Sequence, residues 1–142
     1  MTITDESDNR LRIVNALQLL HDQAVKDSTV GIPIAKVLET SGWSWHVAEL
    51  APAQTIAPHY HRHGDEIYFV LAGAGLIHTW PADESPAARH SQRVEAAATF
   101  SIAPQTVHQL ENTGTTPLVL LFACSPDHLT ADRVVVAAHK AS

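Results

Sequence analysis

The chain has 142 residues, which is enough for one domain with a buried core. Hydrophobic residues make up 45% of it and charged residues 17%, with a formal net charge of −6, so the composition indicates a globular protein and excludes a basic nucleic-acid-binding surface. No apolar run approaches the roughly 20 residues of a membrane-spanning helix. The acidic, polar N-terminus is unlike a secretory signal, and the single cysteine, Cys124, excludes an internal disulfide, so we expect a cytoplasmic protein.

The first predicted element is a short helix within residues 10–26. Asn15 can cap this helix and Gln18 follows three residues later, which is a capping-box pattern. Residues 10–14, just before the cap, are compatible with a short strand. We expect residues 1–30 to form an N-terminal extension that contains the helix.

From residue 32 onward, short β-branched and aromatic runs alternate with turn signals. The clearest runs cover residues 43–50, 66–71, 76–80 and 118–124. Many short strands without intervening helices predict an all-β, antiparallel sandwich or barrel. We expect residues 31–128 to form this β-barrel domain and residues 129–142 to form a C-terminal tail.

Histidines are unusually frequent, with ten against nine Lys and Arg residues, and imidazole is the commonest transition-metal ligand. His59 and His61 are two residues apart on a predicted strand, so they should project from the same face. Glu66 begins the next strand after a four-residue turn, and a hairpin would bring its carboxylate beside the two imidazoles. His108, at the start of a later strand, is the fourth candidate.

Three neutral imidazoles and one carboxylate suit one divalent transition-metal ion, such as Fe, Mn, Ni or Zn. Such a donor set leaves neighbouring positions open to water, substrate or dioxygen, which is typical of a catalytic centre rather than a closed structural one. His63 also lies close by, but the turn from it to Glu66 would be too short. We interpret His63 as a surface turn residue or as a partner that supports a ligand.

Further candidates lie on the predicted strands. Tyr68 shares the face of Glu66 and should point inward, where it would position substrate, carry a proton or pack in the core. Trp43 and Trp45 share one face and suit an aromatic wall, the core or a dimer contact. His46 and His78 lie mid-strand, where a hydrogen-bonded wall histidine is the commoner case.

Other residues are expected to have no role in a site. Four histidines lie in polar or terminal segments and should be exposed, namely His21, His90, His128 and His139. Cys124 lies in an apolar run and should be a buried, unreactive thiol.

The candidate ligands fall in two motifs that resemble those of the cupin superfamily. The first family motif has the form HxH, three or four residues, Glu, six residues and Gly, and it is matched by His59, His61, Glu66 and Gly73. The second ends in Pro-x-Gly-x-x-His-x-x-x-Asn and is matched by His108, with the asparagine at residue 112. The resemblance covers roughly residues 35–125 and implies that these four residues bind the metal.

The chain departs from the cupin pattern at turns rather than at ligands. Ala103 stands where the second motif has proline, and Gln105 stands where it has glycine. The upstream glycines of the two motifs are replaced by Ala53 and Ala97. These changes concern the local backbone conformation and leave the metal-binding pattern intact.

The resemblance implies a jelly-roll barrel (a double-stranded β-helix) of two sheets, with the metal inside near one mouth. Residues 65–75 and 121–126 are similar to small single-domain cupins related to mannose-6-phosphate isomerases. We therefore expect a metal-dependent enzyme with isomerase, cyclase or lyase chemistry on a sugar- or polyketide-like molecule. The alternatives are an iron-dependent dioxygenase and a non-catalytic cupin that binds a small molecule. The expected partners are that small molecule and a second copy of the chain, in a homodimer.

Overall fold

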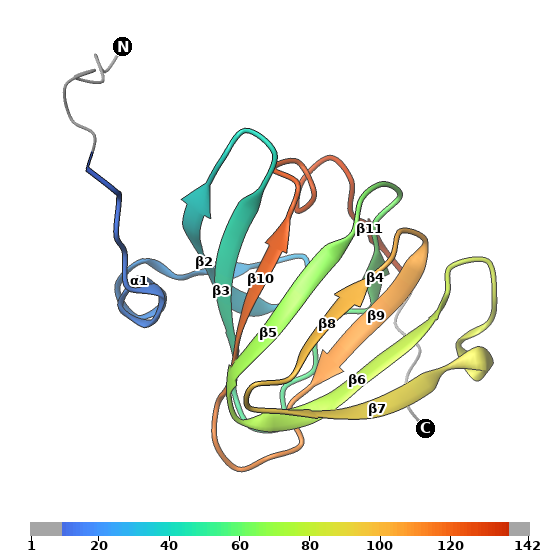
Figure 1. The fold of residues 1–142 in the computed structure, drawn as a ribbon. Coiled ribbons are helices and arrows are strands. Elements are labelled where there is room, and N and C mark those ends of the chain that lie inside the picture. The colour runs from blue at the N-terminus through green and yellow to red at the C-terminus, as the bar shows by residue number, and fades with distance from the viewer. Residues whose placement is uncertain (1–9, 137–142) are drawn as a thin grey trace.

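The computed structural model describes residues 10–136, and these form two antiparallel sheets that face each other (Figure 1). One sheet has six strands, in the order β1 (Val25–Asp27), β2 (Ile32–Glu39), β3 (Ser44–Leu50), β10 (Leu118–Cys124), β5 (Glu66–Ala72) and β8 (Thr99–Ile102). The other has five, in the order β11 (Val134–Val135), β4 (His59–Tyr60), β9 (Thr106–Glu111), β6 (Ala74–Pro81) and β7 (His90–Glu95). The predicted all-β antiparallel jelly roll is confirmed.

The two sheets enclose the main hydrophobic core. Strands of both sheets turn one face inward, so that alternate residues are buried, as the pattern of β5 shows. Val70 and Leu120 of the six-stranded sheet pack in one cluster with Ile77 and Leu110 of the five-stranded sheet. The same cluster also contains Tyr68 and Phe122, which line a cavity together with His59 and Glu66.

The predicted N-terminal helix is α1 (Ala16–Gln23), and its predicted cap is confirmed. The side-chain oxygen of Asn15 accepts a hydrogen bond of 3.0 Å from the backbone N–H of Gln18. The helix covers part of the outer face of the six-stranded sheet, where Leu20 packs against a cluster that includes Val47 and Val119. No helix in the described part of the chain is long and apolar enough to cross a bilayer.

The strand expected at residues 10–14 is wrong, because this segment has no regular structure. The edge of the six-stranded sheet is formed instead by β1, which pairs with β2. The η1 turn (Pro86–Ala88) lies in the connection between β6 and β7.

Three turns contain non-glycine residues with a left-handed backbone. Among the described residues, the non-glycine residues with positive φ are Ala53 (67°), Ala97 (74°) and Gln105 (62°). These are the three positions at which the motifs described above have glycine. The backbone at these positions thus keeps the left-handed conformation that glycine adopts easily. For a residue with a Cβ atom, this conformation costs roughly 1–2 kcal/mol.

The chain does not leave the barrel after β10. Residues 125–133 turn back across the mouth of the barrel, and β11 then pairs with β4 through Val134 opposite Tyr60 and Val135 opposite His59 (Figure 1). We call residues 125–135 the C-terminal strap. Its last strand lies directly beside the strand that carries the first candidate ligand.

Candidate metal centre

The structure brings the four predicted ligands together at the mouth of the barrel. His59 in β4 and His108 in β9 lie directly opposite each other in the strand register. His61 follows the end of β4, and Glu66 is the first residue of β5. All four residues are buried, with at most 4% of each exposed.

The expected hairpin between the strands of His59 and Glu66 is wrong. The strand β4 belongs to the five-stranded sheet and β5 belongs to the six-stranded sheet, so the turn between them crosses from one sheet to the other. Glu66 therefore faces the histidines across the interior of the barrel. The site is assembled from both sheets and depends on their packing.

The donor atoms lie at distances that suit one ion. One nitrogen from each of His59, His61 and His108 lies within 4.8 Å of the other two. The Oε2 atom of Glu66 lies 3.0 Å from Nε2 of His61 and 3.8 Å from Nε2 of His108. Ligand atoms about 2.1 Å from a shared metal are separated by about 3–4 Å, so these spacings fit a single centre.

Each of the three histidines has its Nδ1 atom held by a backbone carbonyl. The carbonyls belong to Ala57 (2.8 Å from His59), Asp132 (2.8 Å from His61) and Thr106 (3.2 Å from His108). A carbonyl oxygen only accepts hydrogen bonds, so Nδ1 carries the proton and Nε2 keeps its lone pair. This is how proteins fix the tautomer of a metal-binding histidine.

Nε2 of His61 and Nε2 of His108 are buried and make no hydrogen bond of good geometry with the described residues, although Nε2 of His61 lies 3.0 Å from Oε2 of Glu66. A buried polar atom without a partner costs roughly 1–3 kcal/mol. A divalent ion in contact with both atoms would remove this cost. The residues present therefore fit a metal ion.

The charge states also suit a metal. Burial lowers the pKa of His59 to about 3, with the nearby His108 as the second cause, and burial lowers the pKa of His108 as well. Burial alone would raise the pKa of Glu66, but its contacts with His128 and His61 outweigh this and hold the pKa well below its usual range. At neutral pH the site thus presents lone pairs on His59 and His108 together with a carboxylate.

His128 is a further residue at this site, and the expectation that it is exposed is wrong. Its side chain is fully buried, and its Nε2 atom lies 2.7 Å from Oε2 of Glu66. Its ring stacks on that of His61, with ring centroids 3.3 Å apart and planes 22° apart. The only sequence signal was the apolar Leu129, Val134 and Val135 nearby, which indicate that the segment after β10 is packed.

Asp132 is a second residue that the sequence did not reveal. Its carboxylate accepts hydrogen bonds from the backbone N–H groups of Arg62 (2.7 Å) and His63 (2.9 Å), while its carbonyl accepts from His61. The side chain of His63 is exposed, as expected of a turn residue. Asp132 thus fixes the turn that joins His61 to Glu66.

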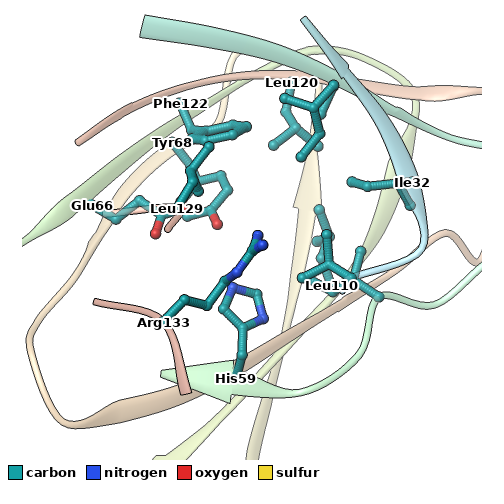
Figure 2. A pocket seen from close by; sticks show the side chains of 13 residues that line it. Ile32, His59, Glu66, Tyr68, Leu110, Leu120, Phe122, Leu129 and Arg133 are labelled. Atoms are coloured by element: carbon teal, nitrogen blue, oxygen red, sulfur yellow. The ribbon is translucent and has the colours of Figure 1, made fainter. Parts of the chain in front are cut away.

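A cavity lies beside the centre, lined by His59, Glu66 and apolar residues of both sheets (Figure 2). The cavity is narrow, with about 30 Å³ open to the centres of water-sized molecules. Tyr68 points into it as predicted, with its ring stacked on Phe100 at 5.1 Å. Burial, followed by the negative charge of Glu66, raises the pKa of Tyr68 well above 10, so the phenol stays protonated.

Arg133, from the C-terminal strap, adds a cation to the wall of the cavity. Figure 2 shows its guanidinium beside His59, projecting into the cavity. Its two terminal nitrogens contact the Asp27 carboxylate at 2.9 and 3.3 Å. The ion pair joins the strap to β1, and it places N–H donors next to the candidate centre.

The two mid-strand histidines, His46 and His78, are hydrogen-bonded residues of the barrel and do not line the cavity. His46 bonds the hydroxyl of Ser44 at 2.7 Å and stacks on Phe122, and burial lowers its pKa to about 4. His78 lies between Ser91 (2.7 Å) and Glu111 (2.8 Å) and does not line the cavity.

The remaining candidates lie away from the centre. Trp43 and Trp45 are each 43% exposed on the outside of the barrel, so they form no wall for a bound molecule in the cavity. Cys124 is buried, and burial raises its pKa to about 12, as expected of an unreactive thiol.

A protein-family model described as the cupin domain matches residues 46–124, which contain all four predicted ligands. The chain belongs to the cupin family. The finer resemblance of this cupin to mannose-6-phosphate-isomerase-like members stays a prediction. No curated protein matches the chain.

Solved structures share the fold of this cupin at low sequence identity. An uncharacterised double-stranded β-helix protein from Klebsiella pneumoniae has a TM-score of 0.67 and 20% identity, covering 91% of this chain and all of that one. The capsular polysaccharide assembling protein CapF from Staphylococcus aureus has a TM-score of 0.68 and 18% identity, covering 81% of this chain and 34% of that one. Oxalate decarboxylase from Bacillus subtilis, a protein with Mn(II) centres, has a TM-score of 0.65 and 18% identity, covering 83% and 31%. The cupin thus spans about a third of the last two proteins.

Proposed function

We propose that this cupin binds one divalent transition-metal ion through Nε2 of His59, His61 and His108 and the carboxylate of Glu66. The supporting observation is the arrangement of the three imidazoles, whose Nδ1 atoms are all engaged by backbone carbonyls while their Nε2 atoms converge. We further propose that the protein is an enzyme acting on a small oxygenated molecule, by isomerase, cyclase or lyase chemistry on a sugar- or polyketide-like substrate.

The chemistry follows from the groups around the cavity. A bound divalent ion supplies a Lewis acid toward a carbonyl or hydroxyl oxygen of the substrate. The phenol of Tyr68, protonated at neutral pH, donates a hydrogen bond or a proton to an oxygen. Apolar side chains, among them Ile32 and Leu110, exclude water and so strengthen these polar interactions.

The cavity also suggests what kind of substrate fits. Its small free volume requires either a compact molecule or movement of the strap. The guanidinium N–H groups of Arg133 that do not contact Asp27 would suit a carboxylate or another anionic oxygen. The similar fold of an oxalate decarboxylase makes small carboxylates a reasonable first set for activity assays.

Elemental analysis of protein purified without an affinity tag tests the metal site. We expect about one equivalent of a transition metal in the wild type and its loss in His108→Ala, because that variant removes a fully buried donor. His63→Ala is the matched control and should keep the metal. Zn, Ni or Mn would favour the non-oxidative reactions.

Two other outcomes would favour the alternatives. Iron as the bound metal would favour a dioxygenase, in which dioxygen and substrate share the open positions. Absence of metal from the wild type, even after reloading, would contradict the proposed metal site and favour a cupin that binds a small molecule without catalysis.

A further inference from the structure

We propose that His128 is a positioning residue of the metal centre, which holds the Glu66 carboxylate where it can bind the ion. This inference rests on the proposed metal site and adds a fifth residue, from outside the two motifs. It gives the C-terminal strap a direct part in metal binding.

The first argument is the tautomer of His128. Its Nε2 atom lies 2.7 Å from Oε2 of Glu66, and an ionised carboxylate only accepts hydrogen bonds, so Nε2 carries the proton. The other ring nitrogen, Nδ1, is buried without a hydrogen-bond partner within residues 10–136. In His59, His61 and His108 the proton sits on Nδ1 instead. His128 is therefore arranged as a donor to the carboxylate through Nε2.

The second argument is the position of Oε2 of Glu66, which lies near two proposed ligands and also accepts the hydrogen bond from His128. Oε2 of Glu66 is the atom that faces both His61, at 3.0 Å, and His108, at 3.8 Å. The hydrogen bond from His128 reaches this same oxygen and so fixes the carboxylate rotamer. A carboxylate accepts more than one contact per oxygen, so donation from His128 leaves room for a metal.

The third argument is that His128 is itself held firmly. Its ring stacks on His61, and its backbone N–H donates to the carbonyl of Ser125 at 3.0 Å in the turn after β10. The residue thus links one proposed imidazole ligand to the proposed carboxylate ligand.

The fourth argument is that the strap has anchors other than His128. Asp132 bonds the turn after His61, Arg133 pairs with Asp27, and β11 pairs with β4. Replacing the His128 side chain should therefore leave the strap in place. This separates the effect of the hydrogen bond from the effect of losing the segment.

The test measures Zn²⁺ affinity of the metal-stripped full chain by competition with a chromophoric chelator. His128→Leu keeps the bulk and removes the donor, and it should weaken Zn²⁺ binding about 10- to 100-fold, the usual effect of losing a partner of a ligand. His128→Gln offers an amide N–H at the end of a side chain of similar reach, and it should restore most of the affinity. His90→Leu, at an exposed histidine of β7, is the matched control and should bind as the wild type does.

A spectroscopic readout distinguishes positioning from a general structural role. The Mn²⁺ electron paramagnetic resonance spectrum should change in His128→Leu and return toward the wild-type form in His128→Gln, because the carboxylate position changes the ligand field. Thermal unfolding of the metal-free variants checks that each is folded. A folded His128→Gln that fails as completely as His128→Leu would overturn the donor role.

The outcomes also separate this inference from the metal site itself. Wild-type affinity and an unchanged spectrum in His128→Leu would overturn the role of His128 and leave the four-ligand site standing. A wild-type protein that takes up neither Zn²⁺ nor Mn²⁺ would overturn the metal site, and the role of His128 with it.

Discussion

Ala97 occupies a left-handed turn position between β7 and β8, next to Ala96, which does not have positive φ. Its amide N–H donates a hydrogen bond to the carbonyl of Val70 in β5 at 2.9 Å, and the turn itself is closed by the N–H of Ala98, which donates to the carbonyl of Glu95 at 2.9 Å. The strain of a Cβ in this conformation is roughly 1–2 kcal/mol, whereas glycine adds about 0.4–1 kcal/mol of entropy to the unfolded chain. The position therefore keeps a net strain that a glycine would remove.

We predict that Ala97→Gly raises the free energy of unfolding by about 0.5–1 kcal/mol, since relief of strain exceeds the entropic loss. Chemical denaturation of the metal-free protein measures this difference. Ala96→Gly is the matched control, because it has only the entropic cost and should destabilise. Equal effects of the two substitutions would contradict the strain at Ala97.

His46 predicts a pH dependence of stability. Its pKa is about 4 in the folded protein, because of burial, against an ordinary value of 6.5. Above pH 6.5 neither state binds the proton, and stability is full; between pH 6.5 and 4 the unfolded chain takes up a proton that the folded protein does not, so stability falls. His59, with a folded pKa of about 3, acts in the same direction.

The measurement is urea unfolding of the metal-free protein at several pH values from 7.5 to 4.5. His46→Gln keeps a hydrogen-bonding group near Ser44 and removes the titration. In this variant we expect the unfolding free energy to depend less steeply on pH. The decrease in slope should correspond to at most about one proton fewer taken up on unfolding. An unchanged slope would mean that His46 titrates alike in both states.

At the scale of elements, period-two alternation predicted the strands and the inward direction of Tyr68, and a capping pattern predicted the start of α1. Both are local signals, and both are confirmed. The pairing of strands is not local, which is why the hairpin between β4 and β5 was wrong. Alternation tells which face a residue takes, but it does not tell which sheet its strand joins.

The motif resemblance anticipated the grouping of His59, His61, Glu66 and His108, but not the strap. Residues 125–133 have no regular hydrophobic period, so the few apolar residues nearby indicate packing but do not tell where the segment packs. The contacts of His128 with Glu66 and of Asp132 with the turn join residues more than 60 positions apart. Such contacts arise only once the barrel has been assembled.

The contacts of Asp132 in the strap predict that this residue stabilises the fold. We expect Asp132→Ala to destabilise the protein by about 1–3 kcal/mol, because two backbone N–H groups in the turn lose their acceptor. Thermal or urea unfolding measures this loss, and Zn²⁺ affinity should fall as well since the turn carries His61. Asp83→Ala, in the exposed loop after β6, should leave both unchanged. A similar result for the two variants would contradict the bracing role of Asp132.

At the scale of the whole molecule, the outer face of the six-stranded sheet is only partly covered by α1. Beyond the helix lie large exposed apolar side chains, namely Trp43, Trp45, Ile67 and Phe69. Several of them line a shallow hollow on this face together with Thr40 and Ala123. Exposed apolar patches on soluble proteins often mark protein interfaces.

We therefore expect the homodimer proposed from the sequence to use this face. Trp45→Glu should shift the protein from dimer to monomer in sedimentation velocity, because a charge replaces an apolar contact. Leu17→Glu, at an exposed position on α1, is a control that should leave the dimer intact. A wild type that stays monomeric at high concentration would contradict the homodimer.

His128 lies after all four proposed ligands in the sequence, so it is synthesised after them. The ribosome releases the N-terminal part first, so every strand that carries a proposed ligand emerges before the strap. Until the strap packs, the mouth of the barrel is uncovered. An ion at the proposed site would therefore exchange with the surroundings faster before the strap packs than after it.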